Sequence, residues 1–143
     1  MGFAWLDGPV DKRSAPEAAS QSFKKGDLIY LVAGAVTIIA ADSKIAGVAL
    51  QDASGVTGTI IMFHAIHPDQ LWIAQLDTTT AQAYEGEDYG LNYGTAGSMA
   101  VDIGDTSTVA VVINQLDPAQ AVGKDGGKVI LRFKAAVCQM ITG

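Results

Sequence analysis

The chain has 143 residues, enough for one domain with a sizeable core, and is 49% hydrophobic but only 17% charged. A small protein with so few charged residues has a largely uncharged surface, which either associates non-specifically or is covered by a partner. We therefore expect an oligomer or a larger assembly. The net charge is −6, and no Lys or Arg lies between Lys44 and Lys124. This excludes a phosphate-neutralising surface over most of the chain, and we expect no contact with nucleic acid.

The first 22 residues show no sustained hydrophobic period and contain two glycines and two prolines. They predict an extended N-terminal arm (residues 1–22) before a folded domain (residues 23–143). Aromatic residues are frequent binding hot spots, and basic residues suit an acidic partner. We therefore expect the arm to bind a partner through Phe3, Trp5, Lys12 and Arg13. A frayed tail without a function is the alternative interpretation.

From Phe23 onward, β-branched and aliphatic runs alternate with turns rich in Gly, Asp and Pro. The runs predict strands over residues 28–32, 36–40, 45–50, 57–66, 71–76, 108–115 and 128–141. Gly47 inside the third of these indicates a bulge or a point of close packing. Between residues 78 and 107, glycines among tyrosines indicate short, bent strands and loops. The pattern predicts an all-β fold, either a small β-barrel or a β-tulip or sandwich domain.

The last predicted strand has the clearest alternation of side chains. One face carries Val129, Leu131, Phe133, Ala135 and Val137, and the other face is marked by Lys128, Arg132 and Lys134. The strand predicted over residues 57–66 differs, because Ile60, Met62 and Ile66 make its second face apolar as well. Such a strand is covered twice within the fold or lies at a subunit contact, and we expect these three residues to bind a partner.

The sequence offers few candidates for catalysis or metal binding. His64 and His67 are three apart, so on a strand they point to opposite faces and are expected to be half-exposed residues at a strand end. Cys138 lies in an apolar run and is expected to be a buried thiol. Five acidic residues are expected to be solvated loop residues, and a calcium site is the alternative interpretation. They are Glu85, Glu87, Asp88, Asp102 and Asp105.

No phosphate-binding loop, dinucleotide fingerprint or nucleophile elbow is present in the sequence. We therefore expect no enzymatic activity, no cofactor and no bound metal. The longest apolar run, residues 28–41, is too short to span a bilayer, and the N-terminal residues lack the pattern of a secretory signal. We expect a protein made in the cytoplasm, with no membrane as its partner.

Several segments, taken in order, resemble the small capsid decoration (cement) proteins of tailed phages. Residues 23–31 read FKKGDLIYL, where Gly-Asp precedes the first predicted strand, and residues 41–55 read ADSKIAGVALQDASG. Residues 84–91 read YEGEDYGL with Val101-Asp102 downstream, and segments 109–117 and 129–140 complete the pattern. The resemblance covers residues 23–141 and leaves the N-terminal arm unmatched.

The resemblance implies a structural virion protein without an active site, built as a β-barrel or β-tulip domain with an N-terminal arm. It implies a place on the capsid exterior, between major capsid protein subunits, where the protein stabilises the mature shell. The major capsid protein would be the partner, and the protein itself would be a homo-oligomer, with a trimer favoured. Phe3 and Trp5 would then belong to the capsid-facing arm.

Three alternatives stay open. The first is another phage structural β-barrel, such as a tail-tube or head-completion subunit. The second is a carbohydrate-binding module or adhesin, for which a stacking platform could be formed by Trp72, Tyr84, Tyr89 and Tyr93. The third is a small metal-dependent enzyme around His64 and His67.

Overall fold

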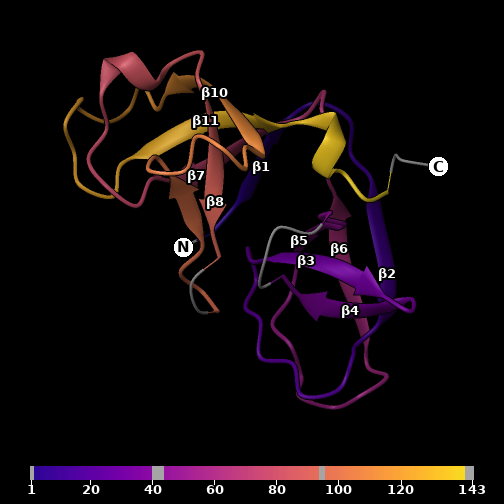
Figure 1. Ribbon diagram of the computed structural model, residues 1–143. Helices are drawn as coiled ribbons and strands as arrows, with labels where there is room; N and C mark the ends of the chain where they lie inside the picture. Colours follow the sequence, from indigo (N-terminus) through magenta and orange to yellow (C-terminus); the bar gives the residue numbers. More distant parts are fainter. Residues whose placement is uncertain (1, 40–43, 94–95, 141–143) are drawn as a thin grey trace.

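The computed structural model describes residues 2–39, 44–93 and 96–140. Within these ranges the chain forms two antiparallel β-sheets, and its only helical elements are the short 3-10 helices η1 (Gln82–Tyr84) and η2 (Ala135–Val137). Figure 1 shows the two sheets as neighbouring lobes. The prediction of an all-β fold is confirmed. The arrangement is sandwich-like, and neither sheet closes into a barrel.

The first sheet has six strands in the order β1-β7-β11-β10-β8-β9. Their bounds are β1 (Ala4–Asp7), β7 (Leu71–Gln75), β8 (Asp88–Asn92), β9 (Ala100–Asp102), β10 (Val111–Leu116) and β11 (Lys128–Phe133). An isolated parallel bridge between Leu76 and Val101 brings the end of β7 next to β9, so this sheet curls around its own inner face.

The second sheet has five strands in the order β2-β6-β5-β3-β4. Their bounds are β2 (Lys12–Pro16), β3 (Leu28–Val32), β4 (Ala35–Ile38), β5 (Gly47–Ala49) and β6 (Ile60–Ala65). A single parallel bridge joins Glu17, just beyond β2, to Val36 in β4. Ala33 and Gly34 form the two-residue loop between β3 and β4, and both have the positive φ angles (49° and 80°) that a type I′ turn requires.

The buried hydrophobic residues form two clusters. The larger one lies between the sheets and joins Leu28 and Val48 of the five-stranded sheet to Trp72 and Phe133 of the six-stranded sheet. The smaller one fills the inside of the five-stranded sheet, where Phe23 covers the inward side chains of its strands. The five-stranded sheet is therefore covered on both faces over part of its area.

The N-terminal residues do not form the separate arm expected for residues 1–22. β1 pairs with β7 at the edge of one sheet, and β2 pairs with β6 at the edge of the other. Phe3 is 3% exposed, and its backbone N–H donates to the carbonyl of Gly26 at 2.8 Å. The segment that was expected to project from the domain therefore passes from one sheet to the other and joins them (Figure 1).

The last strand is shorter than predicted. Val129, Leu131 and Phe133 are buried as the alternation predicted, but β11 ends at Phe133. Ala135 and Val137 belong to η2, because the chain turns there into a single 3-10 turn. Two predicted strand ends, Ile141 and Ala40, lie outside the described residues.

Gly47 is a point of close packing, as its position in a strand indicated. A Cβ atom built on Gly47 would lie 2.2 Å from the backbone carbonyl oxygen of His64, far inside van der Waals contact. The backbone pairing of β5 with β6 passes through this residue, since Gly47 is the partner of Ala65. Any side chain here would push the two central strands apart.

We therefore expect Gly47→Ala to lower the free energy of unfolding by about 3 kcal/mol, because rigid backbone would have to move. Urea denaturation followed by circular dichroism measures the change. The control is Gly104→Ala, whose Cβ would meet only the flexible Asp102 side chain at 3.2 Å and should cost less than about 1 kcal/mol. Equal stability of the Gly47→Ala protein and the wild type would contradict this packing.

Candidate interaction surface

The outer face of the β2–β6 pair is the clearest exposed apolar area on the strands. Directly paired residues of antiparallel strands place their side chains on the same face, and Ser14 pairs with Met62 and Pro16 with Ile60. Ile60 is 60% exposed and Met62 is 42% exposed. We call the surface formed by Trp5, Lys12, Ser14, Pro16, Ile60 and Met62 the β2–β6 face.

The same strand β6 is buried on its other side. Ile61, Phe63 and Ala65 are at most 1% exposed and belong to the smaller hydrophobic cluster. β2 stays at the edge of the sheet, where Pro16 is tolerated because an edge strand need not donate every backbone N–H. One side of the β2–β6 pair is therefore anchored in the core, and the other side is free.

Trp5 lies at one end of the β2–β6 face. Its indole stacks on the imidazole of His64, with ring centroids 6.1 Å apart and an interplanar angle of 23°. His64 is the β6 partner of Lys12, but its side chain is only 3% exposed. A second indole, that of Trp72, contacts His64 edge-on at 5.2 Å. The imidazole is therefore enclosed by two tryptophans beneath the surface.

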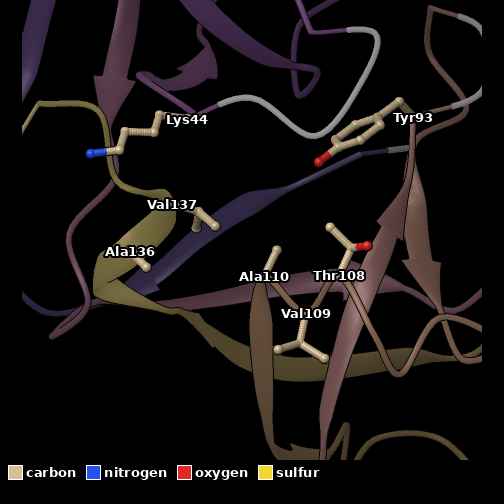
Figure 2. Close-up of a pocket in the computed structure, with 7 residues that line it drawn as sticks. All are labelled: Lys44, Tyr93, Thr108, Val109, Ala110, Ala136 and Val137. Carbon is tan, nitrogen blue, oxygen red and sulfur yellow. The ribbon is translucent and has the colours of Figure 1, made fainter.

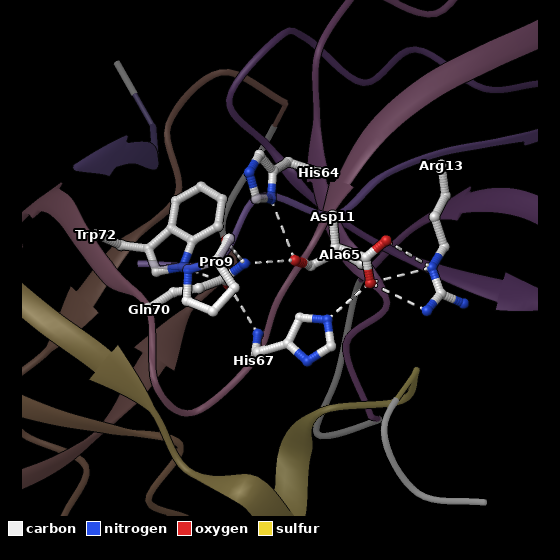
Figure 3. Close-up of polar contacts among 8 residues, drawn as sticks. All are labelled: Pro9, Asp11, Arg13, His64, Ala65, His67, Gln70 and Trp72. Atoms are coloured by element: carbon white, nitrogen blue, oxygen red, sulfur yellow. Dashed lines mark hydrogen bonds and ion pairs between the residues drawn. The ribbon is translucent and has the colours of Figure 1, made fainter. Parts of the chain in front are cut away.

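An ion-pair cluster lies next to this region (Figure 3). The carboxylate of Asp11 accepts hydrogen bonds from Arg13 Nε at 3.0 Å and Nη2 at 3.0 Å, and its Oδ2 lies 2.7 Å from Nε2 of His67. The hydrogen bond from Arg13 is the main reason that the pKa of Asp11 falls to about 2; burial opposes the change, and His67 assists it. Asp11 thus fixes the start of β2 to the β6–β7 turn.

Gln70 connects the same segments through a fully bonded side-chain amide (Figure 3). Its Oε1 accepts the backbone N–H of His67 at 2.8 Å and the indole N–H of Trp72 at 3.1 Å. Its Nε2 donates to the carbonyls of Pro9 at 2.7 Å and Ala65 at 3.1 Å. Gln70 is 0% exposed, and all four hydrogen-bonding positions of its amide are used.

The seven residues expected to bind a partner do not all lie on one surface. Trp5, Lys12, Ile60 and Met62 lie together on the β2–β6 face. Phe3 and Ile66 are 3% and 0% exposed and belong to the core between the sheets, so they do not lie on the surface. Arg13 pairs with Phe63, which places it on the opposite side of β2 from Lys12, and it binds Asp11 there.

The two histidines do not form a shared site. His64 Nδ1 lies 3.2 Å from the carbonyl oxygen of Ala65, whereas His67 contacts Asp11. Within the described ranges, no three His, Cys, Asp or Glu side chains lie close enough together to hold a metal ion. Cys138 is a buried thiol, as expected, and burial raises its pKa to about 11.

The acidic loop residues serve local structure. Glu85 Oε2 accepts the backbone N–H of Leu116 at 2.9 Å, and Asp88 forms an ion pair with Lys134. Asp105 Oδ1 accepts the backbone N–H of Thr108 at 2.9 Å. These contacts hold turns and a strand end. Asp102 lies beside Asp77, where burial and the neighbouring Asp102 carboxyl raise the pKa of Asp77.

The aromatic platform considered for carbohydrate binding is not formed. Trp72 is 1% exposed and Tyr89 is 8% exposed, and both belong to the core between the sheets. Tyr84 packs on Tyr89 edge-on with ring centroids 5.8 Å apart, so it has no open stacking face on that side. Tyr93 lies instead beside a cavity near the junction of the two sheets.

That cavity has a volume of about 130 Å³ and is lined by Lys44, Tyr93, Thr108, Val109, Ala110, Ala136 and Val137. Figure 2 shows the Lys44 amino group pointing away from Tyr93 and Thr108. The described lining residues therefore do not converge on a common point, and they are mostly small and apolar. We assign no chemistry to this cavity.

Sequence reasoning missed the polar residues that support the surface. Gln70, Asp11 and Glu17 act through partners on distant segments, and only Asp11-x-Arg13 gave a local signal of an ion pair. Burial disfavours the charge of Glu17, but the N–H and hydroxyl of Ser54 and the N–H of Gly55 donate to its carboxylate and lower its pKa. This bonding ties the end of β2 to the loop before β6.

No family model matches the chain, and neither the curated proteins nor the solved structures contain a match to it. Over the described part of the chain, no helix has the length and hydropathy needed to cross a membrane.

Replacing Gln70 tests whether the amide network holds the surface in place. We expect Gln70→Ala to lower the free energy of unfolding by about 2–4 kcal/mol, because buried N–H and C=O groups lose their partners. Urea denaturation provides the measurement, and Gln115→Ala, at an exposed position of β10, is the matched control with an effect within about 0.5 kcal/mol. Similar losses in the two variants would contradict the role of Gln70.

Asp11 should make stability depend on pH. A pKa that is lowered to about 2 in the folded protein adds stability above the carboxyl's ordinary value of 3.8, and this contribution is lost as the pH falls toward 2. We expect at most about 2 kcal/mol, because solvent reaches part of the group. Unfolding measured at several pH values should show Asp11→Asn less stable than wild type at neutral pH, with the difference disappearing near about pH 2. A difference that stays constant over this range would contradict the ion-pair cluster.

Proposed function

We propose that this chain is a structural virion protein that binds the outer surface of a tailed-phage capsid between major capsid protein subunits and stabilises the mature shell. The observation that carries the proposal is the β2–β6 face, where two apolar side chains, Ile60 and Met62, are strongly exposed on a rigidly anchored strand pair. The ordered resemblance of residues 23–141 to capsid decoration proteins gives the class of partner.

The composition of the face suits a protein–protein contact. Interfaces typically have an apolar centre and a polar rim, and aromatic and Met side chains are enriched in them. Here Ile60 and Met62 lie beside Pro16 and Ser14 of β2, and Lys12 and Trp5 lie at the His64 end of the same face. A contact of this kind depends on apolar area and needs no convergent set of ionisable groups.

Many copies strengthen such a contact. When a protein is a homo-oligomer, several weak contacts to one lattice raise the effective concentration of each remaining contact. We include this in the proposal, with a trimer as the favoured state. The low charge content, 17% of residues, supports a surface that is covered by partners in the assembled particle.

The alternative of a carbohydrate-binding module has less support. Its proposed platform needs Trp72 and Tyr89 at the surface, and both are buried. The alternative of a tail-tube subunit usually involves a helix across the sheet, and the described helical elements are two 3-10 turns of three residues each.

The proposal is tested with capsid shells assembled without this protein. We expect the wild-type protein to sediment with the shells in a fixed ratio and to raise their melting temperature. The double variant Ile60→Ser/Met62→Ser should bind about tenfold more weakly or worse, because each residue removes apolar area at the centre of the contact.

The matched control is Val122→Ser, which changes another exposed aliphatic residue, 57% exposed, on the loop after β10. It should bind like the wild type. Absence of wild-type binding at every salt concentration would refute the proposed function. Equal binding by the double variant would place the contact elsewhere on the molecule.

A further inference from the structure

One buried acceptor remains without a partner next to the β2–β6 face. Among the described residues, the Nε2 atom of His64 is buried and makes no hydrogen bond. The other ring nitrogen, Nδ1, lies 3.2 Å from the carbonyl oxygen of Ala65. A carbonyl oxygen only accepts, so in the neutral ring Nδ1 carries the hydrogen and Nε2 is an unpaired acceptor.

The fold has little need of an imidazole at this position. The carbonyl of Ala65 also accepts a hydrogen bond from Gln70 Nε2 at 3.1 Å, so it stays satisfied without His64. The ring's packing between two indoles could be provided by a hydrocarbon ring of similar size. A buried acceptor without a donor destabilises the free protein, and such groups call for an explanation.

The two indoles that enclose His64 are held very differently. Trp72 is 1% exposed, and its N–H is bound to Gln70. Trp5 is 40% exposed and lies on β1, a four-residue outer strand whose register is irregular between Trp5 and Asp7. Trp5 is therefore the side chain that can leave the imidazole without disturbing the core.

We propose that Trp5 is a displaceable cover over His64. When a protein partner binds the β2–β6 face, the indole of Trp5 leaves the imidazole and enters an apolar pocket of the partner. A hydrogen-bond donor of the partner, a backbone N–H, a hydroxyl or an ammonium group, then reaches His64 Nε2. This inference rests on the protein-binding role proposed for the β2–β6 face and specifies the chemistry of the partner.

The arrangement explains both unusual features of the free protein. A half-exposed tryptophan and an unpaired acceptor are each unfavourable alone, and one complex relieves both. A partner that offers a pocket without a donor would leave Nε2 unpaired and bind less well. The pair Trp5 and His64 therefore provides selectivity as well as contact area.

The cover is tested directly by the reactivity of His64. Diethyl pyrocarbonate modifies unprotonated imidazole nitrogens, and the chain has only two histidines, which peptide mass spectrometry distinguishes. We expect Trp5→Ala to increase the modification rate of His64 about threefold to tenfold, the range that loss of an aromatic pair gives. Trp5→Phe, which keeps a stacking ring, should stay near the wild-type rate.

His67 is the internal reference, since its Nε2 is bound to Asp11 and Trp5 does not stack on it. Its rate should be the same in all three proteins. If His64 reacts no faster in Trp5→Ala than in the wild type, Trp5 is not its cover and the inference is wrong. This assay needs no partner, so it gives an answer even if the proposed function fails.

The proposed hydrogen bond from the partner to His64 Nε2 is tested with His64→Phe, which keeps a packed ring and removes both nitrogens. We expect the free variant to melt at or above the wild-type temperature and yet to bind the capsid shells about tenfold more weakly. A residue with a purely structural role would not move these two quantities in opposite directions. Unchanged binding would refute the donor to Nε2, whereas absence of wild-type binding would refute the proposed function itself.

Discussion

The buried amide of Gln70 is the interaction on which the relation of the two sheets depends. Its four hydrogen bonds reach the Pro9 carbonyl between β1 and β2, the end of β6, the β6–β7 turn and the indole of Trp72. These groups belong to both sheets and to the segment that crosses between them. An amide suits this position because it offers two donors and two acceptors in one plane. A hydrophobic residue of the same size would fill the space but would leave the Pro9 carbonyl, the His67 N–H and the Trp72 indole N–H without the partner that Gln70 provides.

Most buried polar side chains in this protein are satisfied in the same way. Glu17 accepts from Ser54 and Gly55, and Asp27, which is 0% exposed, accepts the backbone N–H groups of Lys24 and Gly97. Against this background the described residues hold two exceptions, Oε1 of Gln75 and Nε2 of His64. The Nε2 atom of His64 is the one next to the β2–β6 face. It occurs beneath a half-exposed tryptophan on the face that also carries Ile60 and Met62. Exceptions to satisfied burial are expected at functional positions, because selection retains an unfavourable group only where it contributes to something other than folding.

The sequence predicted those elements whose signal is local. β3 has the bounds Leu28–Val32 that were expected, because five consecutive apolar residues stand between two clear turns. β1 and β2 were missed, since they are short, contain Asp, Lys, Arg and Pro, and become strands only by pairing with β7 and β6, far along the chain. The same limit applies to the surface. The apolar character of Trp5, Ile60 and Met62 was visible in the sequence, whereas the burial of Phe3 and Ile66 and the network of Gln70 result from three segments meeting in space.

The crossing of the N-terminal segment has a consequence for synthesis of the protein. β1 and β2 are synthesised well before their partners, β7 (Leu71–Gln75) and β6 (Ile60–Ala65). Pairing of segments so distant in the chain is slow, because loop closure must precede the gain from contacts. The six-stranded sheet is completed later still, because β11, which pairs with β7, is the last strand of the described chain to be synthesised. Since the exposed face combines β2 with β6, it cannot form on a nascent chain until β6 has been synthesised.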